Sequence, residues 1–139
     1  MSRLFAIAIA PHVRRAILAQ ARREAPQECC GLLLGDRGRV LFAAAMRNVA
    51  GSSTRYRVDD GAHLELRRVI RQFSPNLSIL GVYHSHPAGT AEPSPTDLAE
   101  AMYPDWAYVI IGLASPRTSV RAFRIHQGKA DELKIGWRT

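Results

Sequence analysis

Apolar residues along this chain recur with two different periods, one typical of helices and the other of strands. Leu66, Val69, Ile70 and Phe73 follow one another at the i, i+3, i+4 and i+7 spacing that places them on one face of a helix. Asp59 or Asp60 is expected to cap that helix, because a side-chain oxygen at this position can accept a hydrogen bond from a first-turn N–H. The same criteria predict two more helices, one over about 11–24 that ends before Pro26, and a short one over 95–103 that stops at Pro104.

Alternating or continuous apolar stretches predict the strands. Residues 29–35 and 39–46 are expected to form a hairpin that turns at 35–38, where Gly35 and Gly38 flank Asp36 and Arg37. Continuous apolar runs favour buried strands over 78–83 and 107–113, and the second of these is expected to be central. The remaining predicted strands are a first one with alternating Phe5, Ile7 and Ile9, one over 119–125, and a final edge strand over 133–137.

The order of these elements predicts an α+β fold, a mixed sheet with helices packed against it. With 139 residues and 47% hydrophobic residues, the chain fits one domain over 1–139 with an ordinary core. It has no apolar run long enough to cross a membrane. The two cysteines are adjacent and do not make a secreted disulfide framework, so a cytoplasmic location is the default expectation.

The charge balance is strongly basic, with a formal net charge of +7 that comes from 17 Arg and 2 Lys against 12 acidic residues. Such a balance can indicate nucleic-acid binding, but we find no dedicated nucleic-acid module and no basic tract interleaved with aromatic residues. We therefore expect no nucleic-acid partner. A solvated helix face or an acidic protein partner is the alternative explanation for a cluster around the second helix, Arg55, Arg57, Arg67, Arg68 and Arg71.

The clearest candidate for chemistry is a pair of histidines, His84 and His86, which directly follows the apolar run 78–83. Side chains at i and i+2 on a strand point to the same face, so the two imidazoles are expected to lie side by side. Pro87 then starts a loop that can bring Asp97 back to them. Two histidines and a carboxylate leave Zn²⁺ an open fourth position, as catalytic zinc sites do.

Each of these residues also has a structural explanation. Ser94 and Asp97 have the spacing of a capping box at the start of the third helix, and this role is compatible with metal binding. Other HxH sites fit less well, because TIM-barrel hydrolases need about 250 residues and the zinc deaminases need H-x-E and P-C-x-x-C motifs. Iron, which also binds two histidines and a carboxylate, is a minor alternative.

Glu28 is the candidate general base. It stands directly before the apolar strand that begins at Cys29. The alternative explanation is that Glu28 is a solvated loop residue between a helix and a strand. Cys29 and Cys30 are interpreted as packing residues, with only a weak case for Cys30 as a ligand.

Taken together, these motifs resemble the JAMM, or MPN-plus, zinc metalloprotease family. The resemblance rests on Pro26-x-Glu28-x-Cys30-Gly31-Leu32-Leu33-x-Gly35, on His84-x-His86-Pro87 and on Ser94-x-x-Asp97. It implies the MPN fold with a layered architecture like that of cytidine deaminases. It also implies that His84, His86 and Asp97 bind one Zn²⁺, that Glu28 is the general base, and that Ser94 helps to stabilise an oxyanion.

For small prokaryotic members, the family resemblance further implies that the substrate is a ubiquitin-like or sulfur-carrier protein, which is cleaved after a C-terminal diglycine. A deubiquitinase-like isopeptidase and a non-catalytic MPN-type scaffold are the alternatives, and the intact ligand set argues against the scaffold.

Overall fold

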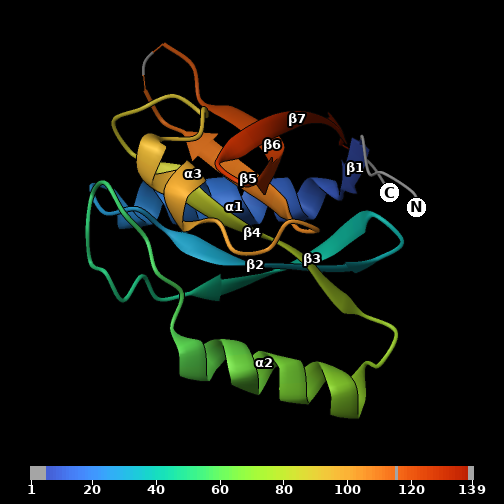
Figure 1. Cartoon of the computed structure of the whole chain (residues 1–139). Coiled ribbons are helices and arrows are strands. Elements are labelled where there is room, and N and C mark those ends of the chain that lie inside the picture. Colours follow the sequence, from blue (N-terminus) through green and yellow to red (C-terminus); the bar gives the residue numbers. More distant parts are fainter. Residues whose placement is uncertain (1–5, 115, 138–139) are drawn as a thin grey trace.

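The computed structural model describes residues 6–114 and 116–137 as seven strands and three helices (Figure 1). No helix in this described part is both long and apolar enough to cross a membrane. The elements in chain order are β1 (Ala6–Ile9), α1 (Pro11–Glu24), β2 (Cys30–Asp36), β3 (Arg39–Met46), α2 (Asp60–Phe73), β4 (Ser78–His86), α3 (Pro95–Glu100), β5 (Ala107–Gly112), β6 (Ser119–His126) and β7 (Lys129–Gly136).

The strands form one mixed sheet in the order β1-β3-β2-β4-β5-β6-β7, which closes on itself because β1 also pairs with β7. β1 runs parallel to both of its neighbours, β4 runs parallel to β5, and the other pairs are antiparallel. The mixed sheet confirms the expected fold class. The prediction that the last strand lies at an edge was wrong, since β1 takes up the backbone hydrogen bonds that β7 would otherwise leave open.

Alternate residues of the central strands face two separate apolar clusters. Leu33, Tyr83 and Val109 belong to the cluster that α1 covers, whereas their chain neighbours Leu32, Val82 and Tyr108 belong to the other. Leu66 of α2 and Leu98 of α3 pack against this second cluster. Figure 1 shows α2 crossing below β2 and β3 on the opposite side of the sheet from α1. The helices therefore cover both faces, and α3 lies on the face to which even-numbered β4 residues point.

The predicted helices are confirmed, with one change in length. α1 has the expected bounds, and the Asp59 carboxylate caps α2 by accepting the Ala62 N–H at 2.9 Å. α3 ends at Glu100 rather than at residue 103. The Tyr108 hydroxyl oxygen accepts the N–H groups of Met102 and Tyr103 at 3.2 and 3.0 Å, so these groups do not continue the helix.

β4 is longer than predicted and runs through both histidines to His86. Its close pairing with β5 depends on Gly81, where an added Cβ would lie 2.1 Å from the carbonyl oxygen of Ala107. Backbone of a neighbouring strand cannot move aside as a flexible side chain can. The strand that carries the histidines therefore requires glycine at this position.

We expect Gly81→Ala to destabilise the protein by roughly 1–3 kcal/mol or more, the usual cost of overpacking. Gly136→Ala is the matched control, because a Cβ at that strand position meets nothing within 4 Å. Urea unfolding of the two variants measures the difference. Equal midpoints would show that the β4–β5 spacing is not constrained by Gly81.

Candidate metal centre and active site

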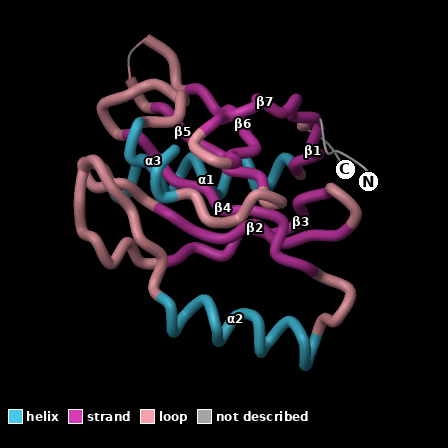
Figure 2. Tube along the Cα trace, in the orientation of Figure 1, coloured by secondary structure: helices cyan, strands magenta, loops and turns pink. Residues whose placement is uncertain are grey.

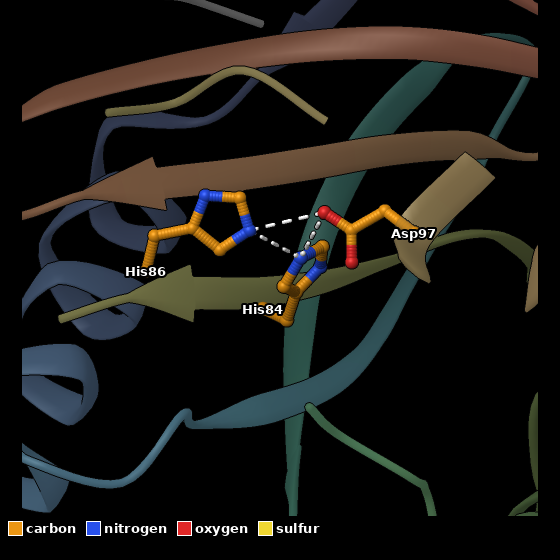
Figure 3. A group of neighbouring side chains, drawn as sticks. All are labelled: His84, His86 and Asp97. Carbon is orange, nitrogen blue, oxygen red and sulfur yellow. Dashed lines mark hydrogen bonds and ion pairs between the residues drawn. The ribbon is translucent and has the colours of Figure 1, made fainter. Parts of the chain in front are cut away.

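β4 and α3 bring three potential ligands together (Figure 3). The Nε2 atoms of His84 and His86 lie 3.1 Å apart, and the Asp97 Oδ2 lies 3.2 Å from the first and 3.0 Å from the second. The histidines share a strand face, as the i, i+2 spacing predicts, and Asp97 sits in the first turn of α3. Among the His, Cys, Asp and Glu side chains in the described part of the chain, these three form a cluster whose geometry suits a metal ion.

The hydrogen bonding of His86 fixes which nitrogen faces the other ligands. Its Nδ1 lies 2.7 Å from the Thr90 carbonyl oxygen, which can only accept, so Nδ1 carries the hydrogen. In the neutral ring Nε2 then presents a lone pair toward the Asp97 carboxylate and the His84 ring. A hydrogen on the His84 Nε2 can be donated to Asp97, whereas a metal ion would engage all three atoms at once. A histidine bonded to a backbone carbonyl through its other nitrogen is typical of metal ligands.

The spacing of the three atoms also fits zinc. Tetrahedral bonds of about 2.0–2.1 Å place neighbouring ligand atoms about 3.3 Å apart, close to the 3.0–3.2 Å found here. Two imidazoles and one carboxylate on a single ion leave one position open. The donor set therefore suits a catalytic rather than a structural zinc site.

Burial and hydrogen bonding favour the metal-binding ionisation states of His84 and Asp97. For His86, burial would lower the pKa, but the hydrogen bonds with Asp97 and the Thr90 carbonyl raise it. Burial lowers the pKa of His84, which is 1% exposed, so its imidazole is neutral at pH 7. Burial alone would raise the pKa of Asp97, but the hydrogen bonds with His84 and His86 outweigh it and hold that pKa well below its ordinary range. A neutral imidazole and an ionised carboxylate are the forms that coordinate zinc.

Ser94 and Asp97 also form the expected capping box of α3. The Asp97 N–H donates to the Ser94 Oγ at 3.0 Å, and the Ser94 N–H donates to the Asp97 Oδ2 at 2.9 Å. The capping role and the position in the ligand cluster are thus combined in one carboxylate. The Ser94 oxygen is used as an acceptor, so its hydroxyl hydrogen remains free to donate.

Glu28 is buried rather than solvated, with 3% of its surface exposed. Burial raises the pKa of its carboxyl to about 7, and the charges of His86, which lowers the pKa, and Asp97, which raises it, act on it too. Its Oε1 has no hydrogen-bond partner among the described residues. An acid of this kind beside a ligand cluster is typical of a general base or acid.

Two contacts of these residues were not identified from the sequence. The Tyr56 ring stacks on the His84 ring with centroids 4.3 Å apart. Ser85 lies between the two histidines, and its Oγ accepts the Cys29 N–H at 2.8 Å, which ties β4 to the segment carrying Glu28. Cys29 and Cys30 are both buried and free, as expected for packing residues.

A cleft of about 530 Å³ opens beside Asp97. The segment 55–58 and the end of α3 form two of its sides. Its other walls are mainly apolar and aromatic, and include Leu32, Val82, Tyr103, Trp106 and Tyr108. The cleft therefore adjoins the ligand cluster at Asp97.

Comparison with protein families assigns the chain. Residues 10–126 match the family described as prokaryotic homologues of the JAB domain. The chain belongs to this prokaryotic JAB family. The match covers all three helices, Glu28 and the ligand cluster, so it confirms the family resemblance seen in the sequence.

Curated relatives of this JAB domain are named as a peptidase, a conjugate-cleaving protease and a desampylase. The CysO-cysteine peptidase of Mycobacterium tuberculosis is 35% identical over 132 residues, which cover 93% of this chain and 89% of the relative. A probable TtuB-protein conjugate cleaving protease of Thermus thermophilus is 38% identical over 129 residues, with 89% and 82% covered. A desampylase of Haloferax volcanii is 32% identical over 135 residues, with 92% and 91% covered.

Solved structures agree on the JAB fold. A protein from Desulfitobacterium hafniense superposes with a TM-score of 0.84 at 32% identity, over 93% of this chain and 90% of that one. A JAB1/MPN domain protein from Archaeoglobus fulgidus gives a TM-score of 0.63 at 18% identity, over 94% and 97%. The second likeness shows the shared MPN fold.

We expect the purified protein to bind one zinc ion per chain. His84→Ala should lose this ion, because the two remaining protein ligands bind zinc much more weakly than three. Elemental analysis after removal of loosely bound metal measures this, with the exposed His126→Ala as the control. A His84→Ala protein that is folded and keeps a full complement of zinc would remove His84 as a ligand.

Proposed function

We propose that this chain is a zinc-dependent peptidase that hydrolyses the amide bond after the C-terminal diglycine of a ubiquitin-like or sulfur-carrier protein. The observation that carries the proposal is the proximity of two features. Three ligand atoms lie within 3.2 Å of one another, and a buried carboxyl with a raised pKa lies beside them.

His84, His86 and Asp97 would hold the zinc ion. When bound, zinc supplies Lewis acidity, which polarises a carbonyl and lowers the pKa of water. Glu28 accepts a proton from the attacking water and later gives it to the leaving amine. The hydroxyl of Ser94 donates a hydrogen bond to the oxygen of the scissile carbonyl as negative charge develops on it.

The cleft beside Asp97 would take the C-terminal tail of the substrate. Segment 55–58 forms one wall, and its backbone is already partly paired through the Val49 N–H, which donates to the Arg57 carbonyl at 2.9 Å. The relatives named for CysO-cysteine and for TtuB-protein conjugates support a carrier-protein substrate. The diglycine ending follows from the family resemblance.

Charge contributes less to this recognition than the sequence suggested. Three of the five clustered arginines are paired with acids of the same chain: Arg55 with Glu100, Arg57 with Asp60 and Arg68 with Glu65. Exposed ion pairs of this kind contribute little to stability, but they reduce the local positive field. Recognition of the tail would therefore depend mainly on the apolar and aromatic lining of the cleft.

The proposal is tested with β-grasp carrier proteins that end in diglycine followed by cysteine, a short peptide extension or an isopeptide-linked lysine. We expect the wild-type protein to cleave after the diglycine in at least one of them. Glu28→Gln should retain zinc but lose turnover by several orders of magnitude, because the amide cannot accept the proton. Mass spectrometry identifies the cleaved bond.

Glu28→Asp is the matched variant, since it keeps the carboxylate but shortens its reach. It should retain measurable turnover. Full activity of Glu28→Gln would overturn the assignment of the base. A zinc-loaded wild-type protein that cleaves none of the three substrate types would favour the non-catalytic scaffold.

The activity should fall at acid pH with Glu28 protonation. The pKa of Glu28 is raised to about 7, so a growing fraction of the base is lost as pH falls below that value. A bound cation favours the ionised carboxylate, so we expect the inflection of kcat/KM at or somewhat below pH 7, with a tenfold decrease per pH unit beneath it. A profile that stays flat down to pH 5 would contradict this role.

A further inference from the structure

The loop between β3 and α2 contains a buried polar side chain that the proposed mechanism does not use. Figure 2 shows this loop as a long irregular segment that leads from β3 to α2. Asn48, near its beginning, is only 7% exposed. Because an unpaired buried amide is costly, its contacts indicate what holds the loop in place.

The carboxamide of Asn48 uses its full hydrogen-bonding capacity. Its Nδ2 donates to the carbonyl oxygens of Glu28 and Arg55 at 3.0 and 2.9 Å. Its Oδ1 accepts the N–H groups of Ala50 and Arg57, both at 3.0 Å. Exchange of the amide oxygen and nitrogen would set like groups against each other at all four contacts, so the orientation of the side chain is determined.

Hydrogen bonds attach the backbone of Glu28 to the loop between β3 and α2. β2 begins only at Cys30, so Glu28 lies outside the regular strand. Its N–H donates to the Ser52 carbonyl at 2.9 Å, and its own carbonyl accepts from Asn48. Both backbone polar groups of the candidate base are thus bonded to the 48–52 part of the loop.

The same carboxamide also holds the residues on either side of Tyr56. It bonds to the carbonyl of Arg55 and to the N–H of Arg57. Tyr56 itself lines the cleft and stacks on His84. One side chain therefore connects the backbone of the base, a wall of the cleft and the ring that packs on a metal ligand.

We propose that Asn48 is a positioning residue that holds the Glu28 carboxylate and the Tyr56-bearing wall of the cleft in one fixed arrangement. This inference rests on the proposed function in that Glu28 is taken as the general base. Misplacement of a catalytic group by about 1 Å can cost roughly 10²-fold in rate. Removal of Asn48 should therefore act on turnover without removing any ligand or base.

The structural half of the proposal is tested on the protein as purified by amide hydrogen exchange of Asn48→Ala. We expect faster exchange at the N–H groups of Glu28 and Arg57, whereas amides in the paired β5–β6 region stay protected. Asn76→Ala, an exposed asparagine in the turn before β4, is the matched control and should leave both sites unchanged. Unchanged protection at Glu28 in Asn48→Ala would overturn the proposal whether or not the protein is a peptidase.

The functional half is tested by kinetics on a substrate that the wild-type protein cleaves. Asn48→Ala should lower kcat about 10–100-fold with zinc still at one per chain. Val13→Ala creates a cavity on the α1 side of the sheet and controls for lost stability, so it should retain wild-type kcat well below its melting temperature. Equal kcat losses in the two variants would mean that Asn48 is only structural.

A double variant shows whether Asn48 acts through the base. In a Glu28→Gln background, Asn48→Ala should lower the residual kcat by a much smaller factor than in the wild-type background, because there is no carboxylate left to misplace and only the Tyr56-bearing wall is still affected. A further loss equal to that seen in the wild-type background would overturn the proposed route. If the wild-type protein has no peptidase activity, the proposed function fails, and the hydrogen-exchange result still decides whether Asn48 orders Glu28.

Discussion

The convergence of three lone-pair donors on one point is the constraint around which this site is built. Two Nε2 atoms and one carboxylate oxygen face each other at 3.0–3.2 Å, and a hydrogen bond to the Thr90 carbonyl fixes the proton of His86 on the far side of its ring. Without a cation, hydrogen bonding between the imidazoles and Asp97 satisfies only part of this set. With one, each donor is satisfied, and the open fourth position gives the site its chemical capability.

The fold maintains this convergence from three directions. Both histidines lie on one face of β4. This strand pairs in parallel with β5, and the pairing requires a close approach of the two backbones at Gly81. The capping box of α3 holds Asp97 in the first helical turn, so the carboxylate of the ligand cluster also starts the helix. The loop 47–59 packs against the third side, where Asn48 and Ser52 bond to the backbone of Glu28. The site thus combines short-range sequence motifs with contacts between distant segments.

The contrast between short-range motifs and long-range contacts explains how much of the site the sequence could predict. Strand periodicity placed His84 and His86 on one face, and the Ser94-x-x-Asp97 spacing predicted the cap, because both features depend on local geometry alone. The closure of the sheet by β1, the shortening of α3 by the Tyr108 hydroxyl and the hydrogen bonds of Asn48 all join residues far apart in the chain or outside regular patterns. Glu28 was assigned through the family resemblance, since neither periodicity nor spacing distinguishes a buried base from a solvated loop carboxylate.

Zinc-edge X-ray absorption on the wild-type protein tests the central claim most directly, since it reports the atoms bound to the ion. The account predicts a four-coordinate ion with nitrogen and oxygen neighbours at about 2.0–2.2 Å, two of them showing the multiple scattering of imidazole. A sulfur neighbour at about 2.3 Å would contradict it and would point to Cys30, which pairs with His84 across β2 and β4. An absorption spectrum without imidazole scattering would exclude His84 and His86 as the zinc ligands.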